Sequence, residues 1–108
     1  MKTNTGFLHV VYFWGREGGT AQDAELLAQG CRTHLSAIPG VLRLEVSYPA
    51  GTARAVVDNS YAVSLLVEFE DAAAQDVYQE HPDHYRFIAE CSKYWSRVQV
   101  YDSLIVPA

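Results

Sequence analysis

Tyr78, His81 and His84 lie close together in the run YQEHPDH. Histidine titrates near neutral pH, so a buried imidazole beside a phenol is a reasonable acid–base pair. His84 begins an apolar stripe at helical spacing, which turns its side chain inward. The stripe consists of His84, Phe87, Ile88, Cys91 and Trp95. We expect His84 to act as general acid–base and Tyr78 to orient a substrate or stabilise an enolate. The alternative is a structural polar cluster that holds a helix break.

His81 precedes Pro82, and its side chain is expected to cap the helix that follows. His81 and His84 also have the i,i+3 spacing of some metal ligands, with Asp83 between them. No second carboxylate–histidine pair completes such a site, so we expect no metal. Acidic residues without any basic residue occupy positions 68–83, and their field would raise the pKa of a nearby imidazole. They are Glu68, Glu70, Asp71, Asp76, Glu80 and Asp83.

His9 interrupts an otherwise apolar face of the first predicted strand, where it alternates with Phe7, Val11 and Phe13. One interpretation is a core histidine satisfied by a single hydrogen bond. The other is a polar group that projects into a cavity between a sheet and helices. His34 lies among polar residues, and we expect it at the surface.

These side chains are positioned by an alternating series of strands and helices. Period-two alternation predicts strands, and apolar residues three and four apart predict helices. The strands are expected at Phe7–Arg16, Val41–Tyr48, Tyr61–Glu70 and Arg97–Val106, and the helices between Thr20 and Pro39, at Asp71–Gln79 and from Pro82 to about Trp95. The order is β-α-β-β-α-β with a split second helix. It predicts an α+β, ferredoxin-like fold with a four-stranded antiparallel sheet and helices on one face.

Length and charge exclude several classes of protein. The chain has 108 residues, which we interpret as a single domain over 1–108, and a net charge of −5 that argues against nucleic-acid or anionic-membrane partners. Cys31 and Cys91 are too few for a disulfide scaffold and are read as small buried hydrophobic residues. No phosphate-binding loop or nucleophile elbow is present. No signal segment is recognisable, so we expect a cytoplasmic protein.

Several short motifs resemble one known family. They are LHVVYF, IPGV, FED and YQEHPDH followed by FI, and His-Pro-x-His within the last is the most specific. Together they are similar to the stress-responsive A/B-barrel (Dabb) family over about residues 7–105. The resemblance implies a dimeric α+β barrel in which two four-stranded sheets face each other, and it implies no cofactor.

The best understood protein of that family is a plant polyketide cyclase that closes a ring by aldol condensation. The resemblance implies an acid–base role for His84, a supporting role for Tyr78 and a pocket position for His9. A third-strand histidine of that cyclase falls at Val63, and a helix-one tyrosine falls at Cys31. The same substrate is therefore not expected.

Three functional hypotheses follow from these residues. The first is a homodimer of unassigned role whose apolar pocket binds a small molecule, such as an aromatic or polyketide-like compound. Its ligand-binding residues would be His9, Val63, Phe87 and Trp95. The second is a cofactor-independent cyclase or lyase that uses His84 and Tyr78. The third is a structural or interaction module without a ligand.

The apolar content, 49% of residues, is high for so small a domain. The first strand is apolar on both faces, and two helices can cover only one face of the sheet. Leu8, Val10, Tyr12 and Trp14 would lie on the uncovered face. Soluble proteins rarely expose such a patch, so we expect a homodimer through the open sheet face.

Overall fold

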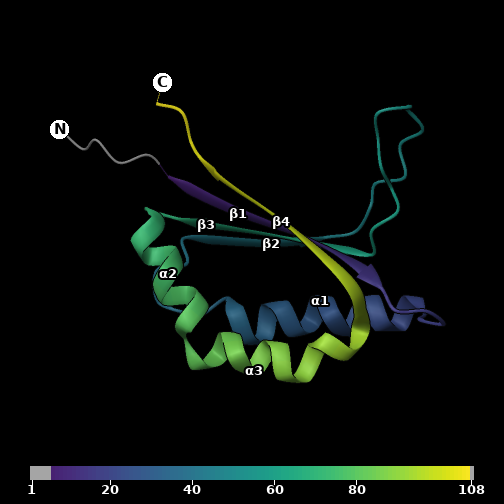
Figure 1. Ribbon diagram of the computed structural model, residues 1–108, viewed down its shortest axis with the longest axis horizontal. Coiled ribbons are helices and arrows are strands. Elements are labelled where there is room, and N and C mark those ends of the chain that lie inside the picture. The colour runs from purple at the N-terminus through teal and green to yellow at the C-terminus, as the bar shows by residue number, and fades with distance from the viewer. Residues whose placement is uncertain (1–5, 108) are drawn as a thin grey trace.

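Four antiparallel strands form a single sheet with three α-helices on one of its faces (Figure 1). The computed structural model describes residues 6–107. The elements are β1 (Phe7–Gly15), α1 (Ala21–Leu35), β2 (Arg43–Ser47), β3 (Val63–Phe69), α2 (Ala72–Glu80), α3 (Pro82–Cys91), the short 3-10 helix η1 (Ser92–Tyr94) and β4 (Trp95–Leu104). The predicted α+β, ferredoxin-like fold with a split second helix is confirmed.

The sheet order is β2-β3-β1-β4, so β1 is a central strand with β3 and β4 on either side. His9 lies opposite Val67 of β3 and opposite Asp102 of β4. Because side chains alternate along a strand, these three residues point to the same face of the sheet. That face is the one covered by the helices.

The helix boundaries follow local signals in the sequence. Asp71 caps α2 by accepting a hydrogen bond from the backbone nitrogen of Ala74 at 2.9 Å. The predicted cap at His81 is confirmed, because its ring accepts a hydrogen bond from the backbone nitrogen of Asp83 at 3.0 Å. At α1 the N-cap residue Thr20 makes no side-chain capping bond.

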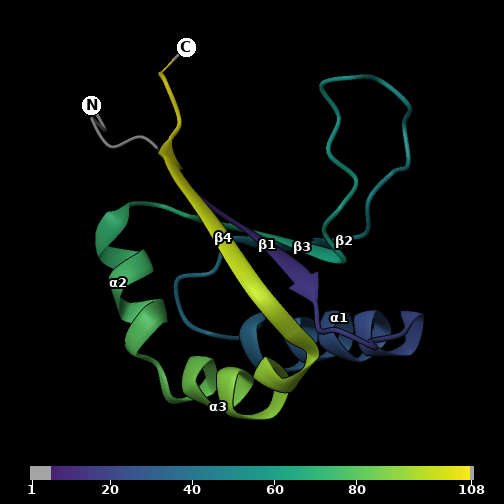
Figure 2. The same ribbon diagram turned by 45° about the vertical axis from the view of Figure 1, so that its right-hand side comes forward.

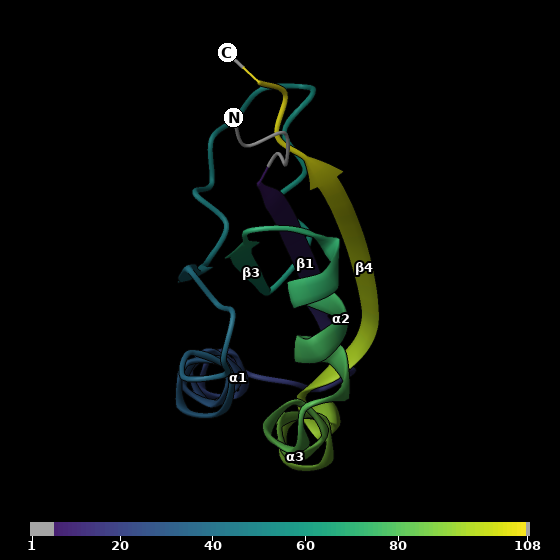
Figure 3. The same ribbon diagram turned by 90° about the vertical axis from the view of Figure 1, so that its left-hand side faces the viewer.

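One continuous core lies between the sheet and the helices. The two central strands contribute six of its thirteen buried residues, the three α-helices contribute another six, and Ile38 follows α1. In Figure 3, α1 and α3 are seen end-on, side by side beneath the sheet. The buried core residues are Val11, Phe13, Leu27, Cys31, Leu35, Ile38, Val63, Leu65, Val67, Phe69, Tyr78, Phe87 and Cys91. This packing leaves the second face of the sheet without helices.

The sheet of one chain is open and does not close into a barrel. The segment between β2 and β3 rises on the side of the sheet opposite the helices (Figures 1 and 2). Over residues 6–107, no helix is long and apolar enough to cross a bilayer.

Candidate functional site

A pocket of about 220 Å³ lies between the sheet and the helices, on the face that carries His9. Strands β1, β3 and β4 form one wall, and α2 and α3 form the other. It is lined by His9, Val11, Phe13, Leu65, Tyr78, Gln79, His84, Phe87, Ile88, Trp95, Val98 and Val100. We call this cavity the helix-side pocket.

Five of the six residues that sequence reasoning selected line this pocket. They are His9, Tyr78, His84, Phe87 and Trp95. Val63 points to the same face of the sheet but is completely buried in the core. Its strand contributes Leu65 to the pocket instead.

His9 forms a hydrogen bond across two neighbouring strands. Its Nδ1 atom lies 2.6 Å from Oδ1 of Asp102, the residue opposite it on β4. His9 is only 5% exposed, so this contact satisfies a nearly buried imidazole. The carboxylate accepts the proton of Nδ1 and fixes which ring nitrogen carries it. Nε2 is the ring nitrogen of His9 that takes no part in this contact.

Asp102 was missed by sequence reasoning. A signal existed, because Asp102 alternates with Val98, Val100 and Leu104 as the polar member of an otherwise apolar series. This is the same pattern that singled out His9. The pairing of the two residues depends on the register of β4 against β1.

Tyr78 is the central aromatic ring of the site. Its ring lies edge-to-face with His84 at 4.9 Å between centroids and with His9 at 5.8 Å. It also packs on Phe69 at 5.1 Å. Burial raises the pKa of the Tyr78 phenol well above its usual value. Tyr78 is therefore a neutral hydroxyl that can donate a hydrogen bond at any physiological pH.

His84 has a free hydrogen-bonding atom at the site. Within the described part of the chain, its Nδ1 is buried and has no hydrogen-bond partner. Burial lowers the pKa of His84, nearby His9 lowers it further, and Glu80 offsets this in part. The acidic neighbour Glu80 raises the pKa of this imidazole, as expected, but desolvation and His9 outweigh it, so the net shift is downward. His84 is neutral at pH 7.

The other titratable side chains singled out by sequence lie outside the pocket. His34 is partly buried on α1 and contacts Glu90 of α3. Burial raises the pKa of Cys31 to about 12 and also raises that of Cys91, so both thiols are protonated and unreactive. Residues 6–107 contain no cluster of three or more His, Cys, Asp or Glu side chains able to hold a metal ion.

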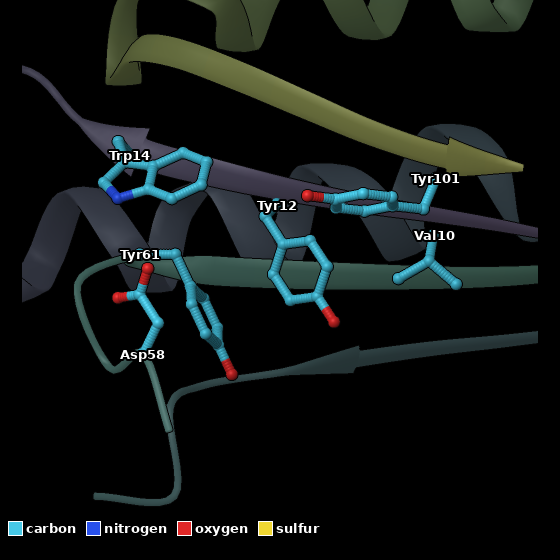
Figure 4. Close-up of a pocket in the computed structure, with 6 residues that line it drawn as sticks. All are labelled: Val10, Tyr12, Trp14, Asp58, Tyr61 and Tyr101. Carbon is cyan, nitrogen blue, oxygen red and sulfur yellow. The ribbon is translucent and has the colours of Figure 1, made fainter. Parts of the chain in front are cut away.

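A second hollow lies on the open face of the sheet and has a volume of about 470 Å³ (Figure 4). Tyr12 lies edge-to-face with Tyr61 at 4.8 Å and with Tyr101 at 6.1 Å. Its lining residues are Val10, Tyr12, Trp14, Asp58, Tyr61 and Tyr101. We call it the open-face groove. It contains no histidine, and its titratable lining residues are Asp58 and the three tyrosines.

The arrangement in the helix-side pocket can hold a small apolar molecule and exchange a proton with it. The phenol of Tyr78 is a donor, and the neutral imidazole of His84 offers an acceptor. Apart from Gln79, the remaining lining is aliphatic and aromatic, which is the usual composition of small-molecule pockets.

The order of elements and strands defines a ferredoxin-like α+β domain. The chain belongs to the stress responsive A/B barrel domain (Dabb) family, whose model matches residues 7–105. A comparison with curated protein sequences finds no match.

Solved structures share the fold at low sequence identity. A dimeric ferredoxin-like protein of unknown function from Thermobifida fusca is 17% identical, with a TM-score of 0.79 over 97% of this chain and 95% of that one. A Dabb family protein from Mesorhizobium loti is 23% identical, with a TM-score of 0.76 over 95% and 99%. Hydroxynitrile lyase from Passiflora edulis is 12% identical, with a TM-score of 0.78 over 97% of each chain.

Proposed function

We propose that this protein is a homodimeric Dabb protein whose helix-side pocket binds a small, apolar molecule carrying one carbonyl or hydroxyl group. The observation that carries the proposal is the convergence of His9, Tyr78 and His84 on one mostly apolar cavity. A buried polar atom without a partner costs about 1–3 kcal/mol, so Nδ1 of His84 is a place where a ligand can gain a hydrogen bond.

The size of the pocket limits the ligand. An apolar cavity of about 150 Å³ holds benzene, and sites for drug-sized ligands begin near 300 Å³. A pocket of about 220 Å³ therefore suits one substituted aromatic ring or an aliphatic chain of similar size. The flat walls offered by Phe87 and Trp95 favour the ring.

A matched pair of probes tests this binding proposal. Acetophenone and ethylbenzene have nearly the same shape, but only acetophenone carries a carbonyl. We expect both to bind, with acetophenone tighter by about tenfold, which is the effect of one hydrogen bond of about 1.4 kcal/mol. The Tyr78→Phe variant should lose that preference. Failure of both probes to bind at millimolar concentration would favour a module without a ligand.

The second candidate function is a cofactor-independent enzyme, a cyclase or lyase acting by acid–base chemistry. Burial shifts the pKa of His84 down and that of Tyr78 up, so a neutral base and a neutral acid lie side by side at pH 7. His84 would take a proton next to a carbonyl, and Tyr78 would donate a hydrogen bond to the enolate oxygen. The hydroxynitrile lyase among the solved structures is an example of an enzyme on this fold.

Proton exchange tests the enzyme without knowledge of the substrate. In heavy water, a base that removes an α-proton from acetophenone exchanges its methyl hydrogens for deuterium, which nuclear magnetic resonance detects. We expect the protein to accelerate this exchange, and His84→Ala to abolish the acceleration. Tyr78→Phe should reduce it by about tenfold to a hundredfold. Equal exchange rates in all three proteins would remove both residues from any such mechanism.

The dimer that we propose is joined through the open sheet faces. Apolar and aromatic residues of β1 and β3 line that face, which would otherwise remain a large exposed patch. The solved structure from Thermobifida fusca is described as dimeric, which supports a dimer here. Sedimentation equilibrium at micromolar concentration should give twice the chain mass of 12.0 kDa. A monomer under those conditions would contradict the proposal.

A further inference from the structure

The connection between β2 and β3, residues 48–62, is long and has no helix or strand of its own. We call it the arm. Hairpin connections usually need about two to five residues, and much longer ones are usually functional or disordered. The arm leaves β2 and returns to β3 in two stretches, which we call its limbs. It is not a simple linker, because hydrogen bonds join the two limbs to each other.

Asn59 joins the two limbs of the arm. Its Oδ1 accepts a hydrogen bond from the backbone nitrogen of Gly51 at 3.2 Å, and its Nδ2 donates to the carbonyl of Thr52 at 3.0 Å. Near the tip, a turn is closed by the backbone nitrogen of Val57, which donates to the carbonyl of Arg54 at 2.9 Å. These bonds hold the arm in one shape.

The base of the arm is fixed to β1 through Trp14. The indole Nε1 donates a hydrogen bond to Oγ of Ser60 at 2.9 Å, and the guanidinium of Arg97 lies 4.1 Å from the centre of the indole ring. Ser60 is itself held by Asp58, whose Oδ1 accepts from its backbone nitrogen at 2.8 Å. The arm therefore leaves the sheet in a fixed direction.

The tip of the arm is exposed although hydrogen bonds define its shape. All residues from Thr52 to Val56 are exposed, and Val56 is 80% exposed. Ordering a residue costs about 1–2 kcal/mol of backbone entropy, which buried surface normally offsets. Among residues 6–107 no buried surface at the tip offsets this cost, and the tip presents Ala53, Ala55 and Val56 around a single charge at Arg54.

We propose that the arm clasps a second copy of this chain, with the tip around Val56 buried against the other protomer. The inference rests on the proposed dimer through the open sheet faces and adds a contact that the sheets alone do not supply. By two-fold symmetry each protomer gives one arm and receives the other.

The geometry of packed sheets leads to this contact. Two sheets that pack face to face lie about 10 Å apart. Each limb of the arm has about six residues and can reach roughly 20 Å when extended. The arm points away from the helices, toward the side where the second sheet would lie (Figures 1 and 2). It must therefore pass alongside the facing protomer rather than end between the sheets.

The open-face groove gives the partner room at the base of the arm. In Figure 4, Asp58 and Tyr61 come from the arm, and Tyr12 and Tyr101 come from the neighbouring strands. The groove has aromatic walls, as do the well-packed centres of protein interfaces. A partner seated in it would contact the arm and the sheet together.

Two substitutions separate the arm from the sheet face. Leu66→Glu places a charge on the open face of β3, and Val56→Glu places one at the arm tip. We expect Leu66→Glu to give a monomer and Val56→Glu to raise the dimer Kd at least tenfold in sedimentation. Val77→Glu, at a 56% exposed position on α2, is the control and should match the wild type. An unchanged dimer Kd for Val56→Glu, beside a monomeric Leu66→Glu, overturns the arm contact and leaves the dimer standing.

Chemical labelling gives a second measurement that does not depend on weakening the dimer. Cys31 and Cys91 are buried, so Val56→Cys adds the one exposed thiol of the described residues. A maleimide should label it at least tenfold more slowly in the dimer than after dilution to monomer. Equal labelling rates in dimer and monomer mean that the tip faces solvent in the dimer, which overturns the clasp. A wild-type protein that is monomeric at micromolar concentration overturns the dimer and the clasp together.

Discussion

Asp102 and His9 lie opposite each other on adjacent strands, and their side chains meet at 2.6 Å on the covered face of the sheet. The carboxylate is 42% exposed, whereas the imidazole is nearly buried. A solvated charge at the edge strand thus orients a ring that faces the helix-side pocket. The contact depends on the register of β4 against β1. It also fixes which ring nitrogen of His9 a ligand would meet.

Replacing Asp102 with asparagine removes the negative charge and keeps the shape of the side chain. We expect the free energy of unfolding to fall by about 1 kcal/mol, since His9 then donates to a neutral amide oxygen instead of a carboxylate whose charge water partly screens. Urea denaturation at pH 7 measures the change. Asp76→Asn, at an exposed carboxylate on α2, should stay within about 0.5 kcal/mol of the wild type. Equal stabilities of the two variants would mean that the His9 contact adds nothing.

Acid should weaken the fold through His84. Its pKa is lowered in the folded state, chiefly by burial, so the unfolded chain binds a proton that the folded chain resists. The contribution of His84 is complete above the ordinary histidine pKa of about 6.5 and is lost as the pH falls below it. Urea denaturation at pH 7.5, 6.5 and 5.5 should show the loss in the wild type and a smaller loss in His84→Gln. His34→Gln, outside the pocket, should keep the larger loss. An equal loss of stability with falling pH in the wild type and in His84→Gln would contradict the burial of the His84 imidazole.

Gly30 brings α1 close to α3 behind the pocket. A methyl group at this position would overlap Sγ of Cys91, and it would also approach Phe87, which lines the pocket. Gly30→Ala should therefore destabilise the protein by about 1–3 kcal/mol, although alanine normally stabilises a helix relative to glycine. Thermal or urea denaturation measures this effect.

The Cys91→Ala substitution removes the overlapping atom and completes a double-mutant cycle. In its presence the cost of Gly30→Ala should shrink by at least 1 kcal/mol, since the two residues are in contact. Additive effects of the two substitutions would show that the close approach of α1 to α3 does not cause the cost of a methyl group at Gly30.

The periodicity of the sequence was sufficient to predict most of the fold and part of the site. The inward direction of His84 followed from its helical stripe, and that of His9 followed from strand alternation. Asp102 could not be paired with His9, because local pattern does not specify the register of β4 on β1. The direction of the His84 pKa shift was also out of reach, since it depends on burial that only the packed structure defines.

Two further features depend on the packed fold. Val63 and Leu65 have the same strand pattern, yet only Leu65 borders the pocket, since α2 and α3 leave space there. The arm was predicted only as a loop, because its direction depends on the contact between Trp14 and Ser60 across distant parts of the chain. Sequence patterns specify which face of a strand or helix carries a side chain, whereas cavities arise from the gaps that packing leaves.

The most direct test of the central claim is calorimetric titration of acetophenone into a variant whose helix-side pocket is filled. Val100 lines the mouth of this pocket from β4, so Val100→Trp should fill it and weaken binding by at least tenfold. Val77→Trp adds the same ring at an exposed position on α2, outside the pocket, and should bind like the wild type. Equal affinities for the wild type and Val100→Trp would contradict the claim that the ligand occupies the pocket of His9, Tyr78 and His84.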